Sequence, residues 1–261
     1  MKRVGCLPVF AVVAFMGALL AVRVAATHQE PDPNDPRQAG ILVPDVLAAN
    51  LQAASDVVND RVARGEISDS DGQRMLAEYA DSLSSTIVLK EIDQKDAWRY
   101  AEVFRTARRW DLAKAAYEYA LSKPRGEGRR VTDTLRLAQC FAELGDVPTA
   151  IATARKVFDA KPADGAPILP GVYLEIIPSA KGKGNERELA KLVEDAVEIH
   201  AKVSVDRSTK EGITFLYARP YHVRKALQLA AQLYRSAGDE EAAKRALDRL
   251  SQLVVGNRMA G

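Results

Sequence analysis

The stretch Leu137–Pro162, LAQCFAELGDVPTAIATARKVFDAKP, decides the fold. Leu137, Ala138 and Phe141 recur at steps of three and four residues, which places them on one face of a helix. Gly145 and Asp146 then predict a corner between two helices. The matching face of the second helix carries Ala150, Ala154 and Val157. Alanine at a helix crossing lets two backbones approach closely, and the closing proline ends the second helix.

The same order of small and apolar residues occurs twice more. Within Tyr100–Pro124 it consists of Tyr100, Ala101, Phe104, Ala113, Tyr117 and Ala120. Near the C-terminus it consists of Ala230, Ala231, Tyr234, Gly238, Ala243, Leu247 and Leu250. This pattern resembles the tetratricopeptide repeat, a helix–turn–helix unit of about 34 residues. The resemblance implies an all-α solenoid of antiparallel helix hairpins, although a helix bundle of another kind would give similar stripes.

The match departs from the family in the first unit. Arg108 or Arg109 stands where a turn glycine is usual, and the longer step to the second unit fits a polar loop over Arg125–Arg130. Prolines, glycines and polar runs divide the rest of the chain. The expected parts are a signal peptide or membrane anchor (1–26), a proline-rich polar linker (27–40), an N-terminal helical hairpin acting as a cap (41–90), two repeats (91–162), a degenerate or irregular helical region (163–212) and a C-terminal hairpin (213–261).

The same sequence patterns predict individual helices, loops and buried residues. In the cap, the first helix is expected to bury Val46, Leu47, Leu51, Ala54, Val57, Val58 and Val62 and to end at Gly65, and Ser70 is expected to cap the second helix. Farther along, we expect a loop over Ala163–Gly171, a helix over Glu186–Lys202, a connector over Val203–Gly212, helices over Val223–Ser236 and Glu240–Val254, and fraying over Gly256–Gly261. The apolar run Ile213–Tyr217 is either a helix start or an extended piece.

The N-terminus has the pattern of an export signal. Lys2 and Arg3 precede the uncharged apolar run Val4–Val22, and small residues follow up to Ala26. Cleavage after Ala26 would give a periplasmic or secreted protein. Without cleavage, residues 4–22 would anchor the chain in a membrane with its body outside the cytoplasm.

Charge gives no general reason to bind nucleic acid. The chain has 37 basic and 35 acidic residues, and Lys2, Arg3 and Arg23 are the charged residues of 1–26, which leaves 34 basic against 35 acidic residues. A nearly neutral body offers no electrostatic drive toward phosphates. We therefore expect a protein or peptide partner and no nucleic acid.

A search for chemistry finds no catalytic motif. Cys140 is the one cysteine beyond the leader, and its place on a repeat helix predicts a small core residue. His28 falls in the linker, and His200 and His222 fall near predicted helix ends, without the spacing of metal ligands. We expect no catalytic residue, no cofactor and no metal site.

In the family resembled here, the first helices of successive hairpins line a groove that holds a peptide or a partner helix. By register, the corresponding residues are Trp98, Glu102 and Arg105, then Leu135, Gln139 and Glu143, and finally Lys225, Gln228, Gln232 and Arg235. Trp98 is either an exposed anchor or buried against the N-terminal hairpin, while Lys225 and Arg235 either grip a carboxylate or remain solvated.

The leading hypothesis is a non-enzymatic interaction module or scaffold, exported across the cytoplasmic membrane. An alternative is a self-assembling envelope protein whose repeat ends stack into oligomers. An enzyme would need residues 163–212 to fold into a pocket with convergent polar groups.

Overall fold

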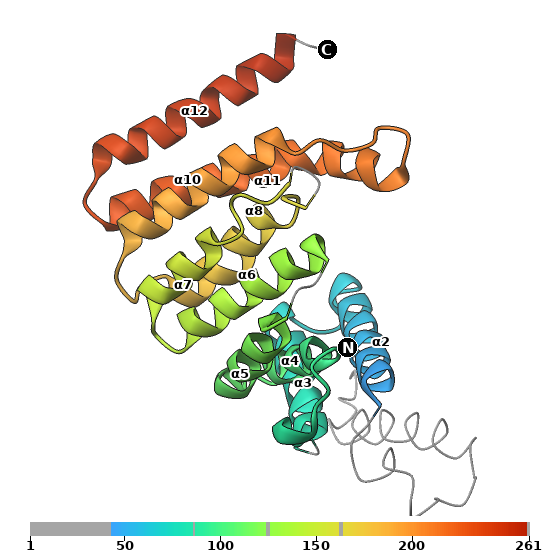
Figure 1. The fold of residues 1–261 in the computed structure, drawn as a ribbon. Helices are drawn as coiled ribbons and strands as arrows, with labels where there is room; N and C mark the ends of the chain where they lie inside the picture. The colour runs from blue at the N-terminus through green and yellow to red at the C-terminus, as the bar shows by residue number, and fades with distance from the viewer. Residues whose placement is uncertain (1–42, 86, 124–125, 162–163, 260–261) are drawn as a thin grey trace, which may run out of the picture. The chain divides into compact units, whose positions relative to one another are not determined.

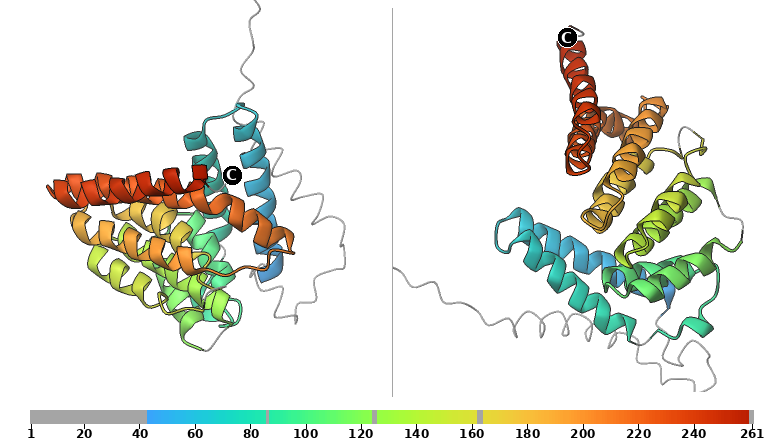
Figure 2. Two further views of the ribbon diagram at one scale, coloured as in Figure 1. Left: turned by 90° about the horizontal axis from the view of Figure 1, so that it is seen from above. Right: turned by 90° about the vertical axis from the view of Figure 1, so that its left-hand side faces the viewer.

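The computed structural model describes residues 43–85, 87–123, 126–161 and 164–259, and every regular element within them is helical. The helices follow one another in chain order from blue to red (Figure 1), and the two further views in Figure 2 show the same order. The predicted leader and linker, residues 1–40, lie outside the described residues. Within the described part, none of the helices combines the length and apolarity needed to cross a membrane.

The first two helices form the expected hairpin. Helix α2 (Pro44–Ala63) buries Leu47, Ala54 and Val58, and Gly65 ends the turn with a φ of 70°. The predicted stripe was too wide, because Val46 and Val57 are 47% and 51% exposed on the side of α2 that faces away from its neighbours.

Helix α3 (Asp69–Ser84) begins two residues earlier than predicted. The Ser68 hydroxyl, and not that of Ser70, accepts the backbone N–H of Asp71 at 3.0 Å and caps the helix. Early in α3, Gly72 lets the helix approach α2, since a Cβ there would lie 2.9 Å from methyl carbons of Val58 and Val62.

Two helix hairpins follow a short 3₁₀ turn, η2 (Leu89–Glu91). They are α4 (Ala97–Thr106) with α5 (Trp110–Leu121), and α6 (Glu127–Glu143) with α7 (Val147–Arg155). Each helix packs on the next. The predicted loop over Arg125–Arg130 was partly wrong, because α6 already begins at Glu127 and carries Arg129 and Arg130 in its first turn.

The small residues of these hairpins lie where the sequence placed them. Ala113, Ala120, Ala150 and Ala154 are completely buried. Gly145 makes the turn of the second hairpin with a φ of 87°, and the Asp146 carboxylate accepts the N–H of Thr149 at the start of α7. In the first hairpin Arg108 adopts a φ of 57°, so an arginine occupies the left-handed position that favours glycine.

The middle region is more helical than expected. The predicted loop extended to Gly171, but the chain turns helical at α8 (Ile168–Pro170), continues as the π-helical η3 (Gly171–Ile176) and ends as α9 (Ile177–Ala180). A proline in the first turn of a helix loses no hydrogen bond, which explains why Pro167 and Pro170 did not prevent helix formation. Gly171 is required by close packing, because a Cβ there would lie 2.9 Å from Leu135 Cδ1.

The last three helices are α10 (Glu186–Lys202), α11 (Lys210–Ser236) and α12 (Glu240–Met259). The helix predicted over Glu186–Lys202 is confirmed with those bounds, while α11 begins well before Val223 and contains Pro220. Of the open alternatives for Ile213–Tyr217, the helix start is the one observed. Helix α12 continues to Met259, past Gly256, where fraying was expected.

One apolar core extends from α6 to α12. It includes Leu135 and Ala138 of α6, Leu192 of α10, and Leu227 and Ala230 of α11. In Figure 1 the yellow to red helices that share this core lie side by side, with α11 between α10 and α12, in agreement with their packing. The face of α11 opposite this core is therefore left at the surface.

Candidate functional site

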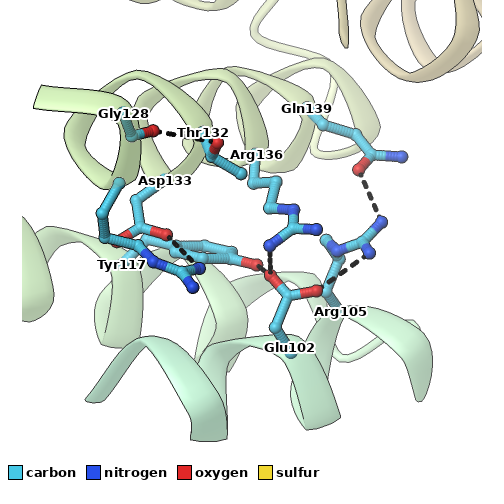
Figure 3. A network of polar contacts seen from close by, with 9 residues as sticks. Glu102, Arg105, Tyr117, Gly128, Thr132, Asp133, Arg136 and Gln139 are labelled. Carbon is cyan, nitrogen blue, oxygen red and sulfur yellow. Dashed lines mark hydrogen bonds and ion pairs between the residues drawn. The ribbon is translucent and has the colours of Figure 1, made fainter. Parts of the chain in front are cut away.

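The predicted site residues of the first two units lie in one network of polar contacts. Its centre is Glu102 of α4, which forms ion pairs with Arg136 of α6 at 2.6 Å and with Arg105 at 3.0 Å. The Tyr117 hydroxyl of α5 donates a hydrogen bond to the same carboxylate. Figure 3 shows these side chains converging on Glu102 from three helices.

The network continues from Arg105 toward α9. The Arg105 guanidinium donates to Gln139 Oε1 at 3.3 Å, and Gln139 Nε2 lies 3.5 Å from the Ser179 hydroxyl oxygen. The Ser179 hydroxyl donates to the Glu143 carboxylate at 2.8 Å. Four predicted groove residues, Glu102, Arg105, Gln139 and Glu143, are thus joined to one another across neighbouring helices.

The electrostatics of this network favour its charged form. Burial alone would raise the pKa of Glu102, but the positive charges of Arg105 and Arg136 and the Tyr117 hydrogen bond outweigh it and hold the pKa below its usual range. Burial, together with the Glu102 charge, raises the pKa of Tyr117 well above its ordinary value. Glu102 is therefore ionised at neutral pH and Tyr117 remains a donor.

Trp98 is half-buried beneath two arginines. The Arg129 guanidinium carbon lies 3.6 Å from the centre of the indole ring, and that of Arg99 lies 4.6 Å from it. Arg129 also pairs with the fully buried Asp133 of α6 at 3.6 Å. An indole stacked in this way already has cationic partners from its own chain.

Leu135, the remaining residue predicted in the second unit, lies in the core. Its side chain is 2% exposed and contacts Gly171 of η3. The family register placed it at the groove, but the middle region turns helical and covers it. Leu135 therefore has no surface to offer a partner.

The predicted residues of the last unit lie on one exposed face of α11. Because α11 is a single helix of 27 residues, this face continues through its N-terminal half. We call it the α11 face; its members, all exposed, are Ile213, Tyr217, Tyr221, Lys225, Gln228, Gln232 and Arg235. Their steps of four and three keep them on one side of the helix over roughly 33 Å, at 1.5 Å per residue.

The aromatic end of the α11 face was not predicted from the sequence. Tyr217 is 84% exposed, Tyr221 is 59% exposed and Ile213 is 44% exposed. The spacing of 213, 217 and 221 by four residues could have revealed it, but the helix was predicted to begin only at Val223. Large exposed side chains aligned on one helix face are typical of a protein contact surface.

The chain around this face is basic. Between Lys202 and Lys225 there are six lysines and arginines against Asp206 and Glu211. The ammonium nitrogen of Lys225 lies 5.8 Å from the centre of the Tyr221 ring. Exposed aromatic and basic side chains thus lie together on this part of α11.

Two histidines lie close to one another, with ring centres 6.2 Å apart, and the ring centre of His222 is also 5.7 Å from that of Tyr221. His222 is inside α11 and not at a helix end as predicted, and its Nδ1 is 2.7 Å from the Tyr173 hydroxyl oxygen. His200 is in the last turn of α10 as expected, but its side chain is buried and its ring nitrogens contact no carbonyl. Across the described residues, no group of three or more His, Cys, Asp or Glu side chains is placed to hold a metal ion.

Comparisons with known proteins place the chain in no family. No family model matches it, and no curated protein matches it. Among solved structures it is similar to a de novo designed helical repeat protein, at 17% identity and a TM-score of 0.26, over 83% of this chain and 98% of that one. A likeness this weak carries no argument, so the helical architecture is taken from the structure of the chain itself.

Proposed function

We propose that this chain is a non-enzymatic helical scaffold whose α11 face binds a protein partner. The observation that carries the proposal is the row Ile213–Tyr217–Tyr221, in which a tyrosine 84% exposed lies between two other exposed apolar side chains on one helix face. Tyrosine supplies a large contact area at low conformational-entropy cost, and tyrosine and arginine are enriched among the residues that dominate binding.

The partner is a protein segment that carries both apolar and acidic side chains. The apolar residues pack against Tyr217 and Tyr221, and the carboxylates pair with the basic side chains around them. The polar end of the face, from Lys225 to Arg235, extends the contact to an extended peptide or a helix of similar length. The network around Glu102 contributes rigidity, because its groups are already paired within the chain.

A photo-crosslinking experiment in cells tests this proposal. A benzoylphenylalanine at position 217 is expected to give adducts with another protein, whereas the same group at Tyr119, a tyrosine 44% exposed on α5, gives none. Adducts only with a second copy of the chain would favour the self-assembling scaffold, and equal adducts at both positions would remove the α11 face from the proposal.

Once that protein is known, the double variant Tyr217→Ser with Tyr221→Ser should bind it about 10–100-fold more weakly. The single variant Tyr119→Ser is the matched control and should bind unchanged. Affinity should also fall as salt is raised, because the basic surroundings of the face contribute screened interactions.

We also propose that α4–α5 and α6–α7 are two tetratricopeptide-like repeats and that α11–α12 is a third. The buried Ala113, Ala150 and Ala243 at the helix crossings support this assignment. So does the left-handed residue at each hairpin turn, which is Arg108, Gly145 or Gly238. The short elements α8 to α9 then interrupt the series.

Export is proposed from the leader pattern alone. Lys2 and Arg3 before Val4–Val22 support either a cleaved signal or an anchor. N-terminal sequencing of the protein isolated from cells distinguishes the two, since a mature chain starting at Thr27 would establish cleavage. An intact Met1 in a membrane fraction would establish the anchor.

A further inference from the structure

A hollow of about 430 Å³ lies between the helices of the middle region and the N-terminal half of α11. It is separate from the α11 face. Its lining includes His200, Lys210, Glu211, Phe215 and His222. The volume is within the range of natural sites for small ligands, which are mostly apolar with a few placed polar groups.

One polar side chain in this lining is unexplained by the fold. His200 is 1% exposed, and neither of its ring nitrogens has a hydrogen-bond partner among the described residues. A buried polar group without a partner costs roughly 1–3 kcal/mol, so native proteins rarely leave one without a reason. A neutral imidazole offers one N–H donor and one acceptor, and here both are buried and neither has a hydrogen-bond partner among the described residues.

Aromatic rings form the walls beside His200. The centre of the Phe215 ring lies 4.8 Å from that of His200, and the centre of the His222 ring lies 6.2 Å from it. His222 is held in place by the Tyr173 hydroxyl at 2.7 Å. Flat rings in these positions suit a planar, apolar molecule.

The surrounding charge favours an anion. Arg219 lies outside the lining; its guanidinium carbon is 4.8 Å from the centre of the Phe215 ring, and its Nη2 donates a hydrogen bond to the Val203 carbonyl oxygen at 2.5 Å. The positive charge of Arg219 helps burial to lower the pKa of His200 to about 4, so the ring is neutral at pH 7 and the local potential is positive. Lys210 adds a second positive charge at the rim, and Glu211 is the one acidic group in the lining.

We propose that this hollow binds a small planar organic carboxylate, with the His200 N–H and Lys210 on the carboxylate and the apolar body against Phe215. The recognition is non-covalent and requires no reaction. It is independent of the proposed α11 face, because the two sites use different residues.

Benzoate is the probe, and benzamide is its uncharged counterpart of the same shape. Titration of the intact protein, followed by long-range proton–nitrogen NMR of the imidazole rings, should shift the His200 ring signals with benzoate. Benzamide should bind at least about tenfold more weakly, since it lacks the charge.

Substitutions of His200 and Lys210 test whether these residues bind the benzoate. His200→Leu should lose about tenfold in benzoate affinity, and the surface variant Lys210→Ala should lose several-fold. The control Lys202→Ala, an exposed lysine that is not part of the lining, should bind as the original chain does.

Three results would overturn the proposal. One is unshifted His200 signals at saturating benzoate, and another is equal affinity in Lys210→Ala and the original chain. The third is a response of the His200 and His222 signals to zinc but not to benzoate, which would make this a metal site. Circular dichroism of His200→Leu shows whether that variant is folded. If it is not, the surface variant Lys210→Ala still tests the proposal.

Discussion

Glu102 shows what a single side chain does in this chain, because two arginines and a tyrosine depend on its charge. Glu102→Gln would remove the carboxylate that pairs with both Arg105 and Arg136, and their side chains are each only 22% exposed. We expect the free energy of unfolding to fall by about 3 kcal/mol at pH 7, as when one partner of a buried ion pair is removed. Urea unfolding measures the loss, and Glu118→Gln, at an exposed position on α5, is the control.

The stabilisation by Glu102 should depend on pH in a stated direction. Its pKa is lower in the folded chain than in the unfolded chain, so its contribution is complete above the unfolded value near 4.5 and is lost as pH falls through the folded value. The difference between the original chain and Glu102→Gln should therefore shrink in acid. A constant difference down to the acid transition would contradict the pairing.

His200 predicts a second dependence on pH. Burial, with Arg219 and His222 beside it, lowers the pKa of His200 from 6.5 to about 4, so between these values the unfolded chain binds a proton that the folded chain does not. Stability from this group is complete above pH 6.5 and decreases as pH falls toward 4, by about 3 kcal/mol in total. Urea unfolding at a series of pH values should show a flatter profile for His200→Leu, and parallel profiles would refute the assignment.

The Cys140 thiol should not react with thiol reagents in the native protein. It is completely buried, and burial raises the pKa of its thiol to about 12, so almost no thiolate is present at pH 8. In a chain with Cys6→Ser, a thiol reagent should label Cys140 only when the protein opens, and labelling should be rapid in denaturant. Fast labelling of the folded chain would mean that α6 is less well packed than the structure shows.

At the scale of elements, the start of α11 depends on a close backbone approach. A Cβ on Gly212 would lie 1.8 Å from the Asp206 carbonyl oxygen, so Gly212→Ala cannot be accommodated without moving the connector. We expect a loss of about 1–3 kcal/mol, typical of overpacking, with faster amide exchange over Ile213–Ala218.

Gly128 provides the matched control for Gly212. It also lies in a first helical turn, that of α6, but the nearest atom to an added Cβ is Asp164 Oδ1 at an ordinary 3.5 Å. Gly128→Ala should leave the exchange of α11 unchanged and stabilise the chain by about 0.5–1 kcal/mol through helix propensity. Equal effects of the two substitutions would show that crowding at Gly212 is not decisive.

At the scale of the whole molecule, substitutions on the α11 face should change binding but leave the stability of the fold almost unchanged. Tyr217→Ser with Tyr221→Ser removes side chains that face solvent, so we expect the free energy of unfolding to change by no more than about 0.5 kcal/mol. Thermal unfolding followed by circular dichroism measures this change. A large loss would mean that the tyrosines serve the fold, and the proposed binding role would then lose its support.

Periodicity was enough to predict the helix hairpins, because alanine spacing on two faces leaves few ways to pack. The sequence was misleading at Pro167 and Pro170, which favoured a loop where the chain is helical. Pro167 and Pro170 stand in first turns, and Pro220 stands within α11, where neighbouring helices hold the chain helical. Tertiary packing, which the local sequence does not display, therefore decided the middle region and the length of α11.

The sequence grouped some of the polar residues of this region but not their contacts. Register selected Glu102, Arg105, Gln139 and Glu143, which do share one region. Their pairing could not be read from the sequence, because it depends on Arg136, Tyr117 and Ser179 arriving from other helices. His200 was likewise identified by its type, but its lack of partners appears only once the surrounding helices are placed.

The exposure of Tyr217 has a consequence for how such a protein evolves. An exposed residue contributes little to stability, so selection for folding constrains it only weakly. Mutations at such a position change what the protein binds but not how much folded protein the cell contains. Descendants of this chain could exchange one ligand protein for another through a few mutations on a single helix. Glu102, tied to three helices, would have to be inherited unchanged through the same history.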